Sequence, residues 1–234
     1  MLSKIRGIIT IFQFVVTVLI TIVLMYAFKS KTHKIRLVWA KMQTYLMSFN
    51  ILIKNKPSDD AKMIMLNHQS LVDIVALEGI YPKNLCWVAK KEIGDIPLFG
   101  HILRAPKMIE IDRKDSRSMV KMLKQAKERL SEGRVIAIFP EGTRGKGEKL
   151  LKFQNGAKVL AEKLNLVVQP VVVVGTRYVF DSKNLSAHSG DVRVVYLEPI
   201  NPADDENWYA KVHAKMQEVL NAELQAIGSV KITV

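Results

Sequence analysis

A histidine and an aspartate five residues apart are the side chains of this sequence best placed for chemistry. His68 and Asp73 belong to the segment Asn-His-Gln-Ser-Leu-Val-Asp, residues 67–73, which follows a short apolar run. If His68 ends a strand and Asp73 lies in the first turn of the next helix, the two side chains can meet. In one continuous helix they would point about 140° apart. An imidazole held by a carboxylate can accept the proton of an attacking hydroxyl, so the pair is a candidate general base.

A second polar segment, Phe-Pro-Glu-Gly-Thr-Arg at residues 139–144, follows another apolar run. Arg144 supplies a cation, Thr143 a hydroxyl, and Gly142 lets the backbone approach a ligand closely. Arg113, after a third apolar run, is a further candidate cation. The carboxylate of Glu141 can hydrogen-bond a hydroxyl group or hold an arginine. These groups suit a phosphate, so the sequence indicates a proton acceptor beside an anion site.

Four blocks in a fixed order resemble the 1-acyl-sn-glycerol-3-phosphate acyltransferase (lysophosphatidic acid acyltransferase) family. Residues 67–73 resemble the family's NHxxxxD motif, and FPEGTR resembles its second signature. Residues 107–113, Lys-Met-Ile-Glu-Ile-Asp-Arg, resemble a strand block that ends in arginine, and residues 168–171, Val-Gln-Pro-Val, resemble a block built around a strand proline. The chain departs from the pattern at Gly145, where serine is common, and at residues 152–156, Lys-Phe-Gln-Asn-Gly, where Pro-Phe-Lys-Lys-Gly is common.

The resemblance implies an enzyme that transfers an acyl group from a thioester to the sn-2 hydroxyl of lysophosphatidic acid, giving phosphatidic acid. His68 would then accept the hydroxyl proton, and Asp73 would hold the ring. The acceptor phosphate would be bound by Arg113, Gly142, Thr143 and Arg144, and the resemblance assigns Glu141 to acceptor binding as well. The donor would be a thioester of acyl carrier protein or of coenzyme A. No cofactor or metal is expected, because the chain has no clustered Cys and His residues.

Other functions remain open at this point. An acyltransferase for glycerol-3-phosphate or another lysophospholipid is an alternative, because the motifs suit any acceptor with a hydroxyl and a phosphate. A non-catalytic basic protein that binds membranes or nucleic acid leaves His68 and Asp73 without a role, and there is no aromatic-rich RNA-binding block. A serine hydrolase would use Ser70, but the chain has no G-x-S-x-G. Residues 142–147 have the spacing of a nucleotide loop, but the lysine and hydroxyl residue that must follow are absent.

The composition and the N-terminal segment predict a membrane-attached protein. A formal charge of +13 favours contact with acidic lipid headgroups or an acidic carrier protein. Residues 8–28 carry no charge and as a helix would match the thickness of a bilayer, about 30 Å. The basic flank is heavier after this segment, which predicts a catalytic domain on the cytoplasmic side of the membrane. Residues 34–53 mix basic and apolar side chains and predict an interfacial helix, so the two helices either include a full span or form a half-inserted hairpin.

Beyond residue 57 the chain alternates short apolar runs with helical periodicity, which predicts an α/β fold. We expect a mixed central sheet of about six to seven strands flanked by helices, preceded by a two-helix membrane-binding motif. The corresponding domains are residues 1–56 and 57–234. The expected strands are 63–66, 85–89, 108–111, 135–139, 167–174 and 192–197, and helices are expected at 116–132 and 208–227. The candidates to line an acyl-chain tunnel are Trp87, Ile93, Ile96, Leu98 and Phe99.

Overall fold

Among the described residues, seven strands form one mixed sheet with the order β1-β9-β6-β2-β5-β3-β4. The structure, a computed structural model, describes residues 1–112, 115 and 117–232, with side chains as far as residue 227. The strands of the sheet are β1 Phe49–Lys54, β2 Met63–Leu66, β3 Leu85–Lys90, β4 Ile109–Ile111, β5 Val135–Ile138, β6 Val168–Val174 and β9 Gly190–Tyr196. The expected α/β class with a mixed central sheet is confirmed.

Five neighbouring strands, from β6 to β4, run parallel, while β9 runs antiparallel to β6 and β1 runs parallel to β9. Strands β2, β5 and β6 are buried along their whole length, as expected for parallel strands that are covered on both faces. The carboxyl ends of the parallel strands meet at one edge, where sites form in such sheets. The segments that follow β2 and β5 are therefore brought together, because these two strands are neighbours.

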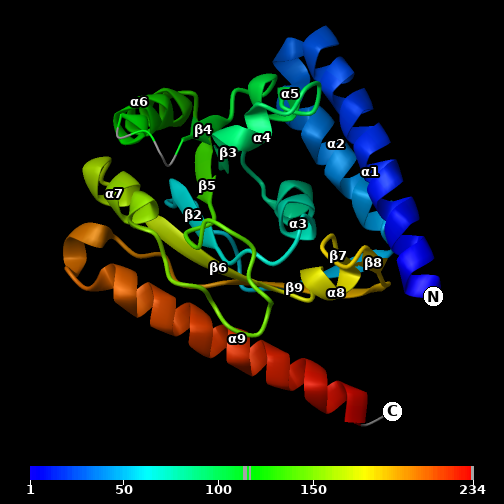
Figure 1. The fold of residues 1–234 in the computed structure, drawn as a ribbon. Coiled ribbons are helices and arrows are strands. Elements are labelled where there is room, and N and C mark those ends of the chain that lie inside the picture. The colour runs from blue at the N-terminus through cyan, green and yellow to red at the C-terminus, as the bar shows by residue number, and fades with distance from the viewer. Residues whose placement is uncertain (113–114, 116, 233–234) are drawn as a thin grey trace.

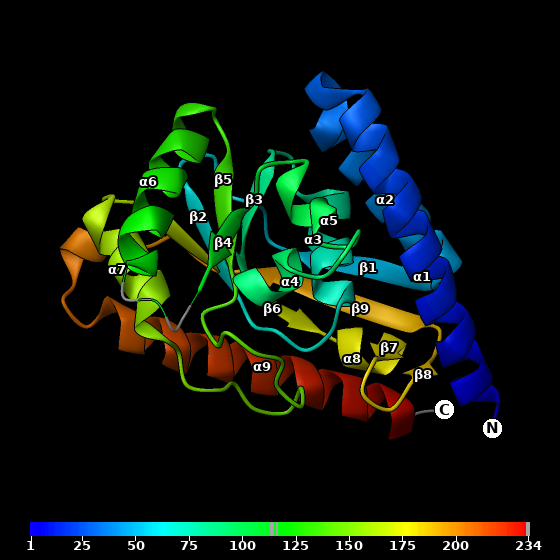
Figure 2. The same ribbon diagram turned by 45° about the horizontal axis from the view of Figure 1, so that its top comes forward.

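Helices cover both faces of the sheet. Figures 1 and 2 show α6, α7 and α9 on one side, and α3 with α2 and α1 beyond it on the other. The helices are α1 Leu2–Ala27, α2 Thr32–Leu46, α3 Val72–Ile80, α4 Lys91–Gly94, α5 His101–Arg104, α6 Ser118–Ser131, α7 Asn155–Lys163, α8 Thr176–Val179 and α9 Trp208–Ile232. The remaining elements are the 3₁₀ turns η1 Lys29–Lys31 and η2 Pro202–Asp204, and a small hairpin, β7 Phe180–Asp181 and β8 Ser186–Ala187.

Helices α6 and α9 follow the expected apolar periodicity. In α6, Met122 and Ala126 are buried one turn apart, and Gly133 after its end adopts a positive φ of 74°, a conformation typical of a glycine that caps a helix C-terminus. Helix α9 is tied to the sheet by the nearly buried carboxylate of Glu223. Its two oxygens accept hydrogen bonds from Lys54 of β1 at 2.6 Å and from Arg193 of β9 at 3.1 Å.

The expectation of a helix over residues 34–53 is wrong in its last part. Helix α2 ends at Leu46, Ser48 turns with a φ of 53°, and residues 49–54 form β1 at the edge of the sheet. The hydrogen-bonding edge of β9 is the reason, because it offers β1 a complete parallel ladder in which Ile51 lies beside Val192. The helical periodicity of residues 34–53 contains no information about β9, which is far away in the sequence. The division of the chain at residues 56 and 57 stays a prediction, although β1 lies before it and belongs to the sheet.

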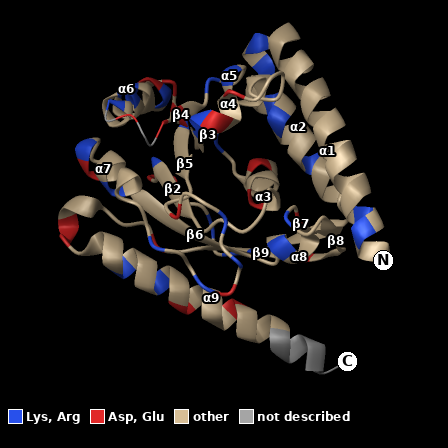
Figure 3. Ribbon diagram, viewed as in Figure 1, with Lys and Arg blue, Asp and Glu red and all other residues tan. Residues whose placement is uncertain are grey.

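Helix α1 is apolar around most of its circumference but packs on the protein through one stripe. Its buried residues recur at helical spacing and are Gly7, Thr10, Phe14, Val18, Thr21, Ile22 and Met25. Near its start it lies against the β7–β8 hairpin, and near its end Tyr26 hydrogen-bonds His101 of α5 at 2.5 Å. The opposite stripe, which includes Ile9, Phe12 and Val23, is exposed. Figure 3 shows the charged positions of α1 confined to its first turns.

Candidate active site

His68 and Asp73 are in contact, as the spacing predicted. His68 lies two residues beyond β2 and Asp73 lies in the first turn of α3, so the chain reverses between them. The ring nitrogen Nδ1 of His68 is 2.8 Å from Oδ2 of Asp73. The carboxylate is fully buried and the imidazole is mostly buried, with 14% of its side chain exposed. With Nδ1 engaged, Nε2 is the nitrogen left for a proton from a substrate.

One oxygen of Asp73 receives three donors. Besides His68, the backbone N–H groups of Gln69 at 2.7 Å and Ser70 at 2.9 Å donate to Oδ2, while Oδ1 is buried and has no partner among the described residues. The two backbone bonds hold the carboxylate still, so that the imidazole meets a fixed acceptor. The negative charge also lies at the N-terminus of α3, where the helix dipole stabilises it.

Asn67 and Ser70 have structural roles that explain their places in the motif. Asn67 continues the pairing of β2 with β6: its Nδ2 donates to the carbonyl of Val173 at 2.8 Å, and its Oδ1 accepts from the N–H of Val173 at 2.7 Å. Ser70 is buried and its Oγ donates to the carbonyl of Phe180 at 2.6 Å. This hydroxyl is thus engaged with a backbone carbonyl of β7.

Glu141 links the two motifs through backbone groups. One carboxylate oxygen accepts from the N–H of His68 at 2.8 Å and the other from the N–H of Leu151 at 2.7 Å. Burial raises the pKa of Glu141 above its ordinary value, and the two backbone donors partly offset that rise. The sequence suggested a bond to a substrate hydroxyl or to an arginine. In the structure, both oxygens of the carboxylate accept backbone N–H groups, one of them from His68.

The turn after Glu141 closes over the histidine. Gly142 has a φ of 68°, a conformation that favours glycine, and Gly145 donates its N–H to the carbonyl of His68 at 2.7 Å. Thr143 and Arg144 are exposed on this turn, and Nη1 of Arg144 donates to Oγ of Ser182 at 2.6 Å. Gly145, where the family commonly has serine, is thus a backbone partner of His68.

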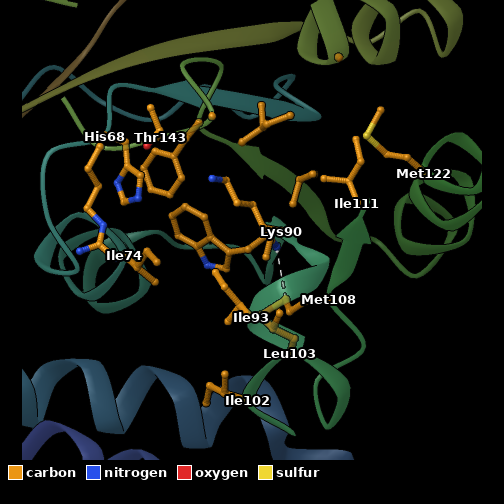
Figure 4. A pocket seen from close by; sticks show the side chains of 18 of the residues that line it. His68, Ile74, Lys90, Ile93, Ile102, Leu103, Met108, Ile111, Met122 and Thr143 are labelled. Atoms are coloured by element: carbon orange, nitrogen blue, oxygen red, sulfur yellow. Dashed lines mark hydrogen bonds between the residues drawn. The ribbon is translucent and has the colours of Figure 1, made fainter. Parts of the chain in front are cut away.

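A cavity of about 820 Å³ adjoins the histidine. Figure 4 shows His68 and Thr143 on one side of it and Ile111 and Met122 on the other. Most of its lining is apolar, and Trp87, Ile93, Ile96 and Phe99 belong to it as predicted. The prediction for Leu98 is wrong, because this side chain is 70% exposed and does not contribute to the lining. A φ of 60° at Leu98 turns the chain there, which no apolar pattern reveals.

Those predicted site residues that the structure describes are brought together. Gly142, Thr143 and Arg144 line the cavity together with His68, and Asp73 lies behind the imidazole. Arg113 lies outside the described residues. Within the described part of the chain, no group of three or more His, Cys, Asp or Glu side chains could hold a metal ion.

Two aromatic rings also support the histidine, through a stacking contact that sequence reasoning did not predict. The ring of Phe139, the first residue of the second motif, stacks on His68 with centroids 3.8 Å apart and planes 18° apart. Trp87 in turn stacks on Phe139, with centroids 5.3 Å apart. Phe139 stood in the motif, but nothing in the spacing connects Trp87 with it.

The chain belongs to the acyltransferase family: the family model described as Acyltransferase matches residues 23–174. The resemblance expected from the motifs is confirmed. The 1-acyl-sn-glycerol-3-phosphate acyltransferase of Helicobacter pylori is 49% identical over 160 residues, which are 68% of this chain and 68% of that protein. The chloroplast enzyme LPAT1 of Arabidopsis thaliana, with the same enzyme name, is 31% identical over 194 residues, 81% of this chain and 54% of that protein.

The fold is similar to that of a solved structure. The crystal structure of the 1-acyl-sn-glycerophosphate acyltransferase from Thermotoga maritima superimposes with a TM-score of 0.75 at 20% sequence identity. The alignment covers 97% of this chain and 96% of the other. The likeness therefore includes the N-terminal helices as well as the sheet.

Proposed function

We propose that this acyltransferase transfers an acyl group from a thioester to the sn-2 hydroxyl of lysophosphatidic acid and forms phosphatidic acid. The observation that carries the proposal is the His68–Asp73 pair beside an apolar cavity, with Thr143 and Arg144 on the adjoining turn. The names of the similar proteins from Helicobacter and Arabidopsis support the same acceptor.

In the proposed reaction, Nε2 of His68 takes the hydroxyl proton as the acceptor oxygen attacks the thioester carbonyl. A carbon–oxygen bond forms, the carbon–sulfur bond breaks, and the proton passes from the imidazolium to the departing thiolate. General base catalysis of this kind is typically worth about 10²–10⁴ in rate. Asp73 stabilises the imidazolium while the proton is on the ring. The substrate supplies the nucleophile, so no enzyme serine is needed.

Acceptor binding is proposed for the cationic turn after β5. Arg144 would pair with the phosphate, Thr143 would donate its hydroxyl, and the positive φ of Gly142 would let the backbone approach. Arg113 is proposed as a second cation on the strength of its motif. Glu141 is proposed to contribute indirectly, because its carboxylate holds the backbone of His68.

Lipid substrates fit a membrane-attached enzyme, and α1 supports this part of the proposal. By length and composition it is the one helix in the described part of the chain that could cross a bilayer, a test that the core helix of a soluble protein can also pass. Because α1 packs along α2, the β7–β8 hairpin and α5, we favour a half-inserted helical hairpin over an isolated span. The heavier basic flank after α1 supports a catalytic domain on the cytoplasmic side.

The acyl donor is proposed to be a thioester of acyl carrier protein or coenzyme A. Lys90 lines the cavity and would suit either the acidic carrier or the phosphates of coenzyme A. Offering both donors to the purified protein together with lysophosphatidic acid, and identifying the products by mass spectrometry, separates the two. Parallel reactions with glycerol-3-phosphate and other lysophospholipids define the acceptor.

The decisive variant is His68→Ala. We expect the rate of acyl transfer by the purified protein in detergent to fall at least about a hundredfold, as loss of a general base requires. Ser70→Ala serves as the comparison, because a serine nucleophile would make it as damaging. Acyl transfer at the full rate by His68→Ala refutes the proposed mechanism.

A further inference from the structure

Three aromatic rings form a stack that begins at the catalytic histidine. The imidazole of His68 lies on Phe139, and Phe139 lies on the indole of Trp87 with 21° between their planes. Trp87 lies within β3, Phe139 directly follows β5 and His68 lies two residues beyond β2, and these three strands are adjacent in the order β2-β5-β3. The bond to Asp73 fixes one atom of the imidazole, but a ring held by one hydrogen bond can still tilt about it. The stack supplies the missing constraint, because it sets the plane of the ring.

The far end of the stack is anchored by a buried charge pair. Nε1 of Trp87 donates to Oε1 of Glu78 at 2.6 Å, and the same oxygen is paired with the guanidinium of Arg36. Arg36 also donates to Oδ1 of Asn84 and to the carbonyl of Leu85. Arg36, Glu78 and Trp87 are each at most 5% exposed. A tryptophan whose N–H is held in this way has one preferred orientation, so the plane of its indole is fixed.

We infer that Trp87 is a positioning residue for His68. The Arg36–Glu78 pair fixes the indole of Trp87, the indole orients the ring of Phe139, and that ring sets the plane of the imidazole. The inference rests on the proposed role of His68 as general base. A displacement of a catalytic group by about 1 Å can cost about a hundredfold in rate, so an indirect support of this kind has a measurable effect.

The anchor also connects the active site with the helix predicted to lie at the membrane. Arg36 belongs to α2, whose other faces expose the apolar side chains of Val38, Met42 and Tyr45. Glu78 belongs to α3, the helix that begins beside Asp73. The packing of α2 on α3 therefore affects both groups that hold His68 in place, the carboxylate of Asp73 and the aromatic stack.

Buried pairs and stacked rings also occur as ordinary core packing, and the chain provides a matched control for that explanation. Trp208 of α9 is buried and its Nε1 donates to Oε1 of Glu162 in α7 at 3.0 Å. Trp87→Phe and Trp208→Phe therefore remove the same kind of bond from the same kind of residue. Only the first lies in the stack on His68.

The experiment compares kcat and KM of the two variants at a temperature at which both are folded. We expect Trp87→Phe to lower kcat about tenfold while KM for both substrates stays within about twofold, and Trp208→Phe to leave kcat within about twofold. Equal kcat values for the two variants overturn the inference. Equal losses of thermal stability do not affect it, because kcat is measured on folded protein.

A pair of double variants tests the anchor without leaving a buried charge unpaired. Arg36→Met with Glu78→Gln keeps an oxygen that can accept the indole N–H, whereas Arg36→Met with Glu78→Leu does not. Replacing both members of a buried ion pair is usually tolerated, so both proteins should fold. We expect kcat of the first to exceed that of the second several-fold. Equal values contradict the anchoring role of Glu78.

A readout independent of turnover separates this inference from the proposed function. Carbethoxylation of His68 by diethyl pyrocarbonate, followed by mass spectrometry of its peptide, reports the accessibility and orientation of the imidazole. We expect Trp87→Phe to change this rate several-fold and Trp208→Phe to leave it unchanged. If His68 is modified at the same rate in the parent protein, Trp87→Phe and Trp208→Phe, the positioning role of Trp87 fails, even where His68→Ala has shown the histidine to be essential. If His68→Ala is fully active, the proposed role of His68 as general base fails, whatever the modification rates.

Discussion

Asp73→Asn tests whether the negative charge of Asp73, apart from its hydrogen bonds, promotes acyl transfer. Three donors converge on Oδ2, while Oδ1 has no partner. In the variant, the amide oxygen can take the place of Oδ2 and keep the two backbone bonds, because an amide nitrogen there would face two N–H groups. The oxygen then still accepts from Nδ1 of His68, so the ring keeps its orientation and its tautomer. The variant removes the charge and places the amide nitrogen at the position of Oδ1, which has no partner among the described residues.

The size of the expected effect follows from the distance between the charges. An imidazolium and a carboxylate about 4 Å apart attract each other by about 4 kcal/mol at an effective dielectric constant of about 20. The proton is only partly transferred in the transition state, so part of this energy is lost. Since about 1.4 kcal/mol corresponds to tenfold in rate, we expect kcat to fall about 10²–10³-fold.

Asp73→Ala provides the contrast in stability. It leaves the N–H groups of Gln69 and Ser70 without an acceptor, at about 1–3 kcal/mol for each buried donor. For a chain of this size, that corresponds to a fall in Tm of several degrees at least, whereas Asp73→Asn should change Tm by much less. Steady-state kinetics with lysophosphatidic acid and thermal denaturation in detergent measure the two effects. A kcat for Asp73→Asn within about threefold of the parent value, or equal losses of Tm in both variants, refutes the reasoning.

Two further predictions concern the packing of the terminal helices. Burial alone would raise the pKa of Glu223, but the hydrogen bonds from the lysine of β1 and the arginine of β9 outweigh it and hold that pKa below its ordinary value. Its contribution to stability is therefore present above the pKa of the unfolded state and is lost as the pH falls through the folded value. Glu223→Gln should lower the free energy of unfolding by about 1 kcal/mol at pH 7 and by less in acid. Urea titrations of the parent protein and the variant measure this change, and an equal change at both pH values contradicts the prediction. Gly7→Ala places a Cβ 2.0 Å from the carbonyl oxygen of Leu185, so α1 must shift away from the β7–β8 hairpin. This shift should lower the free energy of unfolding by about 1–3 kcal/mol. In Gly79→Ala the new Cβ makes only ordinary contacts, the nearest at 3.7 Å, so this variant should not lower Tm. Equal Tm values for the two glycine variants would count against the packing of α1.

Local patterns were sufficient for much of the fold and for the central pair of the site. The buried strand 63–66 and the helix after it are both encoded in contiguous residues, and the spacing of His68 and Asp73 across one chain reversal places their side chains in contact. The periodicity of α6 and the glycine after it likewise act over a few residues. Interactions of this range can be read from the order of residue types.

Roles that depend on neighbouring strands could not be read in the same way. The oxygens of Glu141 accept hydrogen bonds from the backbone N–H groups of His68 and Leu151, and the bond to His68 forms because β5 lies beside β2. Residues 49–54 were expected to be helical, and they form a strand because β9 offers them a ladder from the other end of the chain. In both cases, the deciding partner is far away in sequence and contributes backbone groups, which carry no residue signature.

The sequence by itself determined the family, the α/β class and the histidine–aspartate pair, because the motifs and the hydrophobic periods are written in consecutive residues. The tertiary structure alone decided what holds that pair in place. The stack of His68, Phe139 and Trp87 and its anchor at Arg36 and Glu78 join five elements of the fold. Side chains from such separate segments meet only when the sheet is assembled and α2 has packed on α3, so their common role follows from the three-dimensional contacts.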